Sequence, residues 1–146
     1  MKKIIILIVC NILINSVAFA QSSQKDLDLY KITKMMEWKG KKSLPFEIDK
    51  DSVLTDIVSD GTTLRYIVKF KASKQMHLKE VKASGGTIEE EKEFLRSSNI
   101  NKLCNMSSVK DLVNAGMYID YQYKFPDGEV FVVVQINKFT CENNHE

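Results

Sequence analysis

The chain has 146 residues, of which 44% are hydrophobic and 27% charged, with 21 basic and 19 acidic side chains. This length suits one ordinary domain with a single core. A charge balance so close to neutral, with no basic stripe, is unfavourable for binding nucleic acid, so we expect no nucleic-acid partner.

The first 20 residues have the pattern of a cleavable secretory signal. Lys2 and Lys3 give a short positive region, an apolar run follows, and Ala18-Phe19-Ala20 supplies the small residues that a signal peptidase accepts. We therefore predict cleavage after Ala20 and a mature single domain, residues 21–146, in the periplasm or outside the cell.

Two other interpretations of this segment are weaker. A retained membrane anchor needs about 20 predominantly apolar residues, and Asn11, Asn15 and Ser16 interrupt the run. A lipoprotein signal would use Cys10, but the residue before a lipidated cysteine is small, whereas here it is Val9. We therefore expect no lipid anchor and expect Cys10 to leave with the signal.

Removal of the signal changes the charge and the cysteine count. Loss of Lys2 and Lys3 lowers the basic residues from 21 to 19, which equals the 19 acidic residues. Cys104 and Cys141 remain. An even count in an oxidising compartment favours a disulfide over a metal site. The bridge would close a loop of about 38 residues, which the chain-entropy relation converts to about 4 kcal/mol of stability.

The mature chain begins with a helical pattern at residues 22–39. Apolar residues recur at helical spacing, Ser23 and Asp26 match a capping box, and Gly40 provides a stop. Pro45 disfavours helical backbone in the residue before it, so the chain changes direction here.

A hairpin is predicted next, with Asp60-Gly61 as a two-residue turn. This register places Ile57 opposite Leu64 on one side of the sheet. It places Asp56 opposite Arg65 on the other side, and such a cross-strand pair of opposite charges supports the register.

The middle of the chain is polar and then helical. After Phe70 we expect irregular structure with one short helical turn at residues 77–82. Thr87 and Glu90 form a second capping box, which starts a helix that extends to about Leu103. This helix is expected to bury Ile88, Phe94, Leu95 and Ile100.

A short helix that starts at Ser107 or Ser108 and ends at Gly116 leads into a second hairpin, with Asp127-Gly128 as its turn. The face of this hairpin that points away from the expected core is mixed, because Phe131 and Val133 interrupt its polar residues. The tail after Cys141 is polar and is expected to fray. The core face is expected to hold Met117, Ile119, Tyr121, Tyr123, Phe125, Val130, Val132, Val134 and Ile136.

These elements together predict an α+β fold. Its sheet would have four antiparallel strands from the two Asp-Gly hairpins, and about three helices would pack mainly on one face.

The chain has few residues in patterns that are typical of catalysis. His77 and His145 are its two histidines, and no nucleophile motif accompanies them. The acidic run at residues 89–93 is explained better as a helix start than as a carboxylate pair. Asp49 and Asp51 lack the glycine and terminal glutamate of a calcium loop. We expect no enzyme activity, no metal and no cofactor.

The order of features from Leu44-Pro45 onward resembles a known family. An antiparallel pair follows, then a helix that ends at Cys104, then Ala115-Gly116-Met117-Tyr118, a terminal hairpin and Cys141. This order is similar to the beta-type pilotins of type II secretion systems, in which a cysteine pair bridges helix and last strand. The resemblance implies binding of a C-terminal secretin segment. The family's lipid anchor has no counterpart at the expected mature N-terminus, Gln21.

We therefore expect a non-enzymatic exported module, a pilotin-like adaptor that binds a protein segment from a secretion system, by the groove between the first helix and the sheet. The alternative is an immunity or inhibitor protein that neutralises a toxin or hydrolase in the envelope. For Met36 and Trp38, core packing competes with partner binding. The candidate partner-binding residues are Met36, Trp38, Tyr118, Phe131 and Val133.

Overall fold

The computed structural model describes residues 25–144, so the predicted signal, its cleavage site and the capping box at Ser23 lie outside the described residues. The helices are α2 (Lys25–Lys41), α3 (Lys74–Ala83), α4 (Ile88–Cys104), α5 (Ser107–Asn114) and α6 (Lys138–Glu142). The strands are β1 (Phe46–Glu47), β2 (Ser52–Asp60), β3 (Thr63–Phe70), β4 (Tyr118–Lys124) and β5 (Val130–Ile136).

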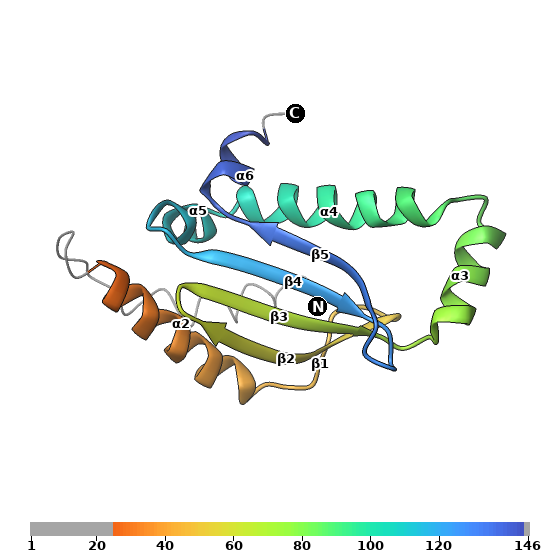
Figure 1. The fold of residues 1–146 in the computed structure, drawn as a ribbon, viewed down its shortest axis with the longest axis horizontal. Helices are drawn as coiled ribbons and strands as arrows, with labels where there is room; N and C mark the ends of the chain where they lie inside the picture. Colours follow the sequence, from red (N-terminus) through yellow and green to blue (C-terminus); the bar gives the residue numbers. More distant parts are fainter. Residues whose placement is uncertain (1–24, 145–146) are drawn as a thin grey trace.

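The sheet is mixed and has five strands in the order β1-β2-β3-β4-β5 (Figure 1). The expected α+β class is confirmed, but the expected four antiparallel strands are wrong in two respects. The two hairpins join through a parallel β3–β4 pair, because helices α3 to α5 carry the chain back to the end of the sheet at which β3 began. The additional strand, β1, has two residues and is too short to show an alternating pattern.

The first hairpin forms with a register different from the predicted one. Asp60 pairs with Thr63, so the turn is Gly61-Thr62, and Gly61 adopts a φ of +58° that suits glycine. The predicted Asp56–Arg65 pair is absent, because Asp56 now lies opposite Ile67.

The second hairpin confirms most of its predicted register, including Ile119 opposite Ile136. A register shift next to Lys124 pairs this residue with Val130. Because one additional residue on a strand reverses which face the next side chains occupy, Phe131 turns into the core and is 8% exposed. Val130, predicted to be buried, is 47% exposed.

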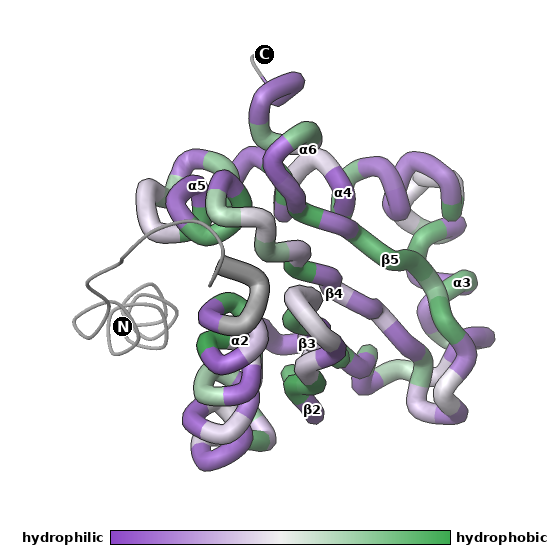
Figure 2. Tube along the Cα trace, turned by 60° about the vertical axis from the view of Figure 1, so that its left-hand side comes forward, coloured by the Kyte–Doolittle hydropathy of each residue, from purple (hydrophilic) through white to green (hydrophobic). Residues whose placement is uncertain are grey.

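The helices pack on the same face of the sheet, and Figures 1 and 2 show α2 beside β2 and β3. Ser59 of β2 donates a hydrogen bond to Glu37 of α2. Tyr123 of β4 accepts a 2.9 Å hydrogen bond from Asn99 of α4. The pairing registers place both side chains on one face. The largest side chains of this core with under 2% exposure are Phe125, Leu64, Met117, Ile136, Val68, Val113, Val134 and Thr33, together with smaller contributors.

Helix α2 lies close to β2. It continues through Gly40 to Lys41 rather than stopping at the glycine as predicted. A Cβ atom at Gly40 would overlap the Cδ1 atom of Ile57, so the residue permits close packing instead of ending the helix. Thr33 Oγ1 also donates a 2.8 Å hydrogen bond to the Gly61 carbonyl at the turn.

The predicted number of about three helices is too low, since residues 25–144 contain five. Helix α3 has ten residues, not a single turn, and Ser73 caps it. The predicted capping box of Thr87 and Glu90 begins α4 and is confirmed. Phe94 is 67% exposed, so its predicted burial is wrong. Helix α6 was not predicted, because its five residues are too few to show a period.

Candidate partner-binding surfaces

The outer side of α2 carries a stripe of alternating aromatic and basic residues, Tyr30, Lys34, Trp38 and, in the turn that follows, Lys42. We call these residues the α2 stripe. Tyr30 is 45% and Trp38 59% exposed. The Nζ atom of Lys42 lies 3.3 Å from the centre of the Trp38 ring, and that of Lys34 lies 5.9 Å from the centre of the Tyr30 ring. Residues four apart share a helix face, so the stripe offers large apolar rings together with positive charge.

One flank of α2 is held to the sheet through Glu37. Its carboxylate accepts hydrogen bonds from Lys41 Nζ at 2.8 Å, from Ser59 Oγ at 2.5 Å and from Lys34 Nζ of the stripe at 3.3 Å. The hydrogen bond from Lys41, followed by that from Ser59, lowers the pKa of Glu37 to about 2. The α2 stripe therefore lies on a helix that is held to the sheet by the bond to Ser59 and by its buried side chains. The charge of Lys34 in the stripe is paired with that of Glu37.

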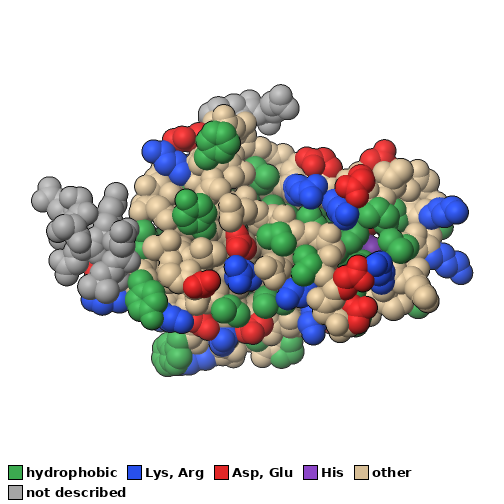
Figure 3. Space-filling model, in the orientation of Figure 1, with side chains coloured by type: hydrophobic (Ala, Val, Ile, Leu, Met, Phe, Trp, Pro, Cys, Tyr) green, Lys and Arg blue, Asp and Glu red, His purple; other side chains and the backbone are tan. Residues whose placement is uncertain are grey.

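The face of the sheet opposite to the helices, which we call the open face, is exposed to solvent at several hydrophobic positions. Tyr118 and Val133 are each 43% exposed there. A polar row crosses its centre, because Asp120 accepts hydrogen bonds from Arg65 Nη2 at 3.4 Å and from Gln135 Nε2 at 3.1 Å. Figure 3 shows hydrophobic side chains scattered among acidic and basic ones.

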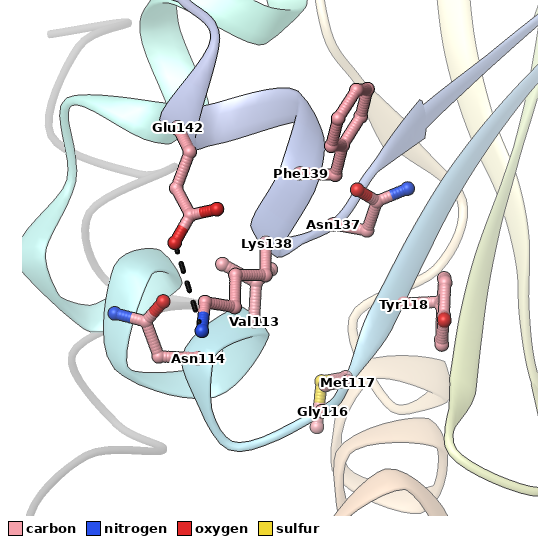
Figure 4. A pocket seen from close by; sticks show the side chains of 9 residues that line it. All are labelled: Val113, Asn114, Gly116, Met117, Tyr118, Asn137, Lys138, Phe139 and Glu142. Atoms are coloured by element: carbon pink, nitrogen blue, oxygen red, sulfur yellow. Dashed lines mark ion pairs between the residues drawn. The ribbon is translucent and has the colours of Figure 1, made fainter.

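One end of this face borders a pocket of about 490 Å³ between α5, the start of β4 and α6 (Figure 4). Tyr118 lies at one side of it, and Phe139, which is 73% exposed, lies on α6. Lys138 and Glu142 point toward one another at 3.6 Å near Asn114. The pocket has mixed polar and apolar walls and no concentration of charge.

The disulfide between Cys104 and Cys141 is present, as predicted, with a Cα–Cα distance of 5.1 Å. It ties α6 to the end of α4. Because α6 supplies Phe139 and part of the pocket wall, the bridge holds this wall in place.

His77 has neighbours that the sequence did not reveal. It stacks on Phe70 with ring centres 4.5 Å apart and also contacts Phe125 and Phe131. Its Nε2 atom lies 3.0 Å from Glu91 Oε2. These contacts attach α3 to the end of the sheet, so the structure gives His77 a packing role.

Within residues 25–144, no three histidine, cysteine or acidic side chains are placed together as a metal site would require. Within the same range, no helix has the length and apolar character needed to span a bilayer.

The predicted partner-binding residues do not form one site. Met36 and Phe131 lie in the core, 7% and 8% exposed, and are not accessible at the surface. Trp38 lies on α2, whereas Tyr118 and Val133 lie on the open face, at the other side of the sheet. Sequence reasoning missed Tyr30, although its spacing of eight residues from Trp38 places it on the same helix face.

This small α+β domain, with its helices on one face of a five-stranded mixed sheet, is similar in fold to solved structures of type II secretion pilotins. The pilotin EpsS of Vibrio vulnificus matches with a TM-score of 0.63 and 15% identity over 82% of this chain and 97% of that chain. The pilotin AspS of Vibrio cholerae matches with a TM-score of 0.56 and 12% identity over 82% of this chain and 97% of that one.

A candidate secreted protein from Pseudomonas aeruginosa is also similar, with a TM-score of 0.62 and 16% identity over 83% of this chain and 99% of that chain. No family model and no curated relative matches the sequence. At such identities the likeness establishes the fold alone.

Proposed function

We propose that this protein is a non-enzymatic, pilotin-like adaptor that acts outside the cytoplasm by binding a segment of a secretion-system protein. The observation that carries the proposal is the match to two pilotins over 82% of this chain and 97% of theirs. The disulfide supports an oxidising compartment, in agreement with the secretory signal expected at residues 1–20.

The α2 stripe is the surface we propose for this segment. Exposed tyrosine and tryptophan are the side chains that most often dominate the energy of protein interfaces. Tyr30 and Trp38 offer such rings on a helix that Glu37 ties to Ser59 of β2, so little ordering of the helix would be needed on binding. The partner is a C-terminal secretin segment, as the resemblance to pilotins implies.

The test is a binding measurement with the mature chain, residues 21–146. Fluorescein-labelled peptides from the C-termini of secretins encoded by the same genome would be titrated, and binding followed by fluorescence anisotropy. We expect saturable binding, and a loss of about 30-fold in affinity for W38A, because truncation of a central aromatic residue costs about 2 kcal/mol.

Phe94→Ala is the matched control, since Phe94 is an exposed aromatic residue on another helix, α4, and its loss should leave affinity unchanged. If no secretin C-terminus binds, the pilotin-like role is wrong. If a peptide binds equally to the native protein and to W38A, the role stands but the α2 stripe is not its site.

A further inference from the structure

Two lysines lie side by side on the open face without an acidic partner. Lys69 of β3 and Lys124 of β4 are directly paired across the parallel strands. Neither forms an ion pair with any residue in the described range. The nearby Lys71 and Lys74, by contrast, are paired with Glu47 at 2.7 Å and Glu129 at 2.6 Å.

This placement is unfavourable for the isolated domain. Like charges that face each other across neighbouring strands are destabilising, and both lysines are partly buried, so water screens their repulsion less than at a fully exposed site. A carboxylate placed above the pair would reverse the sign of this interaction, because it would attract both ammonium groups.

Hydrophobic side chains adjoin the two lysines. Val130 lies opposite Lys124 and is 47% exposed. In the next row across the sheet, Val133 is 43% exposed, Ile67 is partly buried, and the polar Gln122 lies between them. We call the two lysines, the two valines and Ile67 the lysine–valine patch. The hydrogen-bonded row of Arg65, Asp120 and Gln135 lies beyond it and is internally compensated in charge.

We propose that the lysine–valine patch docks an acidic segment of a partner protein, whose carboxylates lie over Lys69 and Lys124 and whose aliphatic side chains cover Val130 and Val133. Charge complementarity selects this occupant, since the patch combines apolar surface with two uncompensated positive charges. On the face drawn in Figure 3, basic and hydrophobic side chains adjoin over the strands.

This surface is separate from the α2 stripe, because the open face and the helix-covered face lie on opposite sides of the sheet. The proposal does not depend on the identity of the secretin. It gives the domain a second docking surface, which would allow it to hold two partners at once.

The probe is a labelled peptide of about ten residues in which aspartates and valines alternate with serines, together with a matched peptide in which asparagine replaces each aspartate. Binding to the mature chain is measured by anisotropy, and the contact surface is mapped by amide chemical shifts. We expect the aspartate peptide to bind about ten-fold more tightly, since two charge-assisted contacts of about 0.7 kcal/mol each correspond to that factor. Its shift changes should centre on β3, β4 and β5.

The double variant K69Q/K124Q should lose this preference for aspartate while it keeps the native circular dichroism spectrum. The control variant K79Q/K82Q changes two exposed lysines of α3 and should keep the preference. Equal binding of both peptides to the native protein, or a preference that survives in K69Q/K124Q, would overturn the proposal.

Two further measurements exclude other occupants. Lysine-dependent binding to phosphatidylglycerol vesicles without any preference between the peptides would identify a membrane surface and overturn the proposal. Self-association in sedimentation that K69Q/K124Q abolishes would identify a second copy of this chain and overturn it equally. Loss of secretin binding in W38A leaves the peptide preference unchanged, so the two proposals fail separately.

Discussion

At the scale of single residues, the register shift beside Lys124 decides which side chains of the second hairpin reach the core. Ile119, Tyr123 and Ile136 are buried as their spacing predicts. Phe131 was predicted to be available to a partner, yet the register shift beside Lys124 turns it into the core. A bulge of this kind has no reliable sequence signal, because it depends on how two strands meet in space.

Glu37 is expected to make stability depend on pH. Its pKa is lowered from 4.5 to about 2, so its carboxylate contributes stability that is present above about pH 5 and is lost as the pH falls toward 2. E37Q should therefore lower the free energy of unfolding at pH 7 by about 1 kcal/mol. This difference should shrink between pH 5 and pH 2.

Urea unfolding of the native protein and E37Q at several pH values measures this effect. E80Q is the control, since Glu80 is an exposed residue of α3 without a side-chain partner in the described range. A difference between native and E37Q that stays constant from pH 7 to pH 2 would contradict the role of the ionised carboxylate.

Gly40 gives a second prediction, because two explanations of this glycine predict stability changes of opposite sign for G40A. If the glycine only ended the helix, alanine would stabilise α2 by about 1 kcal/mol through its helix propensity. Because a Cβ would overlap Ile57, we expect G40A to lower the free energy of unfolding by about 1–3 kcal/mol. Thermal unfolding decides the sign, and G86A, where a Cβ meets no atom closer than 3.7 Å, is the control.

At the scale of elements, the sequence predicted helices with strong end signals and missed those held by tertiary contacts. Thr87 and Glu90 mark the start of α4. Helix α3 has only a few apolar residues, and of its ten residues, all within the described range, His77 is the one that is buried. A pattern with one buried position has no period to detect.

His77 is therefore expected to hold α3 in place. H77A should increase hydrogen exchange at residues 74–83 and lower the free energy of unfolding by about 2 kcal/mol, through lost packing against Phe70. Hydrogen exchange measured by mass spectrometry reports both effects: exchange at residues 74–83 reports the opening of α3, and exchange of the most protected core amides reports the free energy of unfolding.

Met76→Ala is the matched control, because Met76 is on the same helix but is 56% exposed. It should change neither quantity by more than about 0.5 kcal/mol or its equivalent in exchange. Unchanged exchange of α3 in H77A would show that other contacts anchor this helix.

At the scale of the whole molecule, each hairpin was predictable because its two strands are close in sequence. Their arrangement was not, because the parallel pairing of Leu64 with Ile119 brings together residues far apart in the chain. The partner-binding surfaces could not be predicted for the same reason. Trp38, Tyr118 and Val133 were named from local patterns, and only the tertiary structure places them on two different sides of the sheet.

The disulfide is expected to stabilise the entire domain. The relation between loop length and entropy predicts a loss of about 4 kcal/mol in C104S/C141S, since the bridge joins residues separated by 37 positions. Chemical unfolding with and without reductant measures this loss. Thiol labelling of denatured protein isolated from the periplasm is the independent check, and two free thiols per mature chain would contradict the bridge.

The parallel β3–β4 pair has a consequence for cleavage of the chain. A cut between Gly85 and Gly86, in the segment between α3 and α4, would give two fragments, with one antiparallel hairpin in each. Cys104 and Cys141 both lie in the second fragment, so no covalent bond would join the two. The nicked protein would stay together only through the β3–β4 ladder and the shared core. The dissociation constant of the two fragments would therefore measure directly the free energy that these contacts contribute.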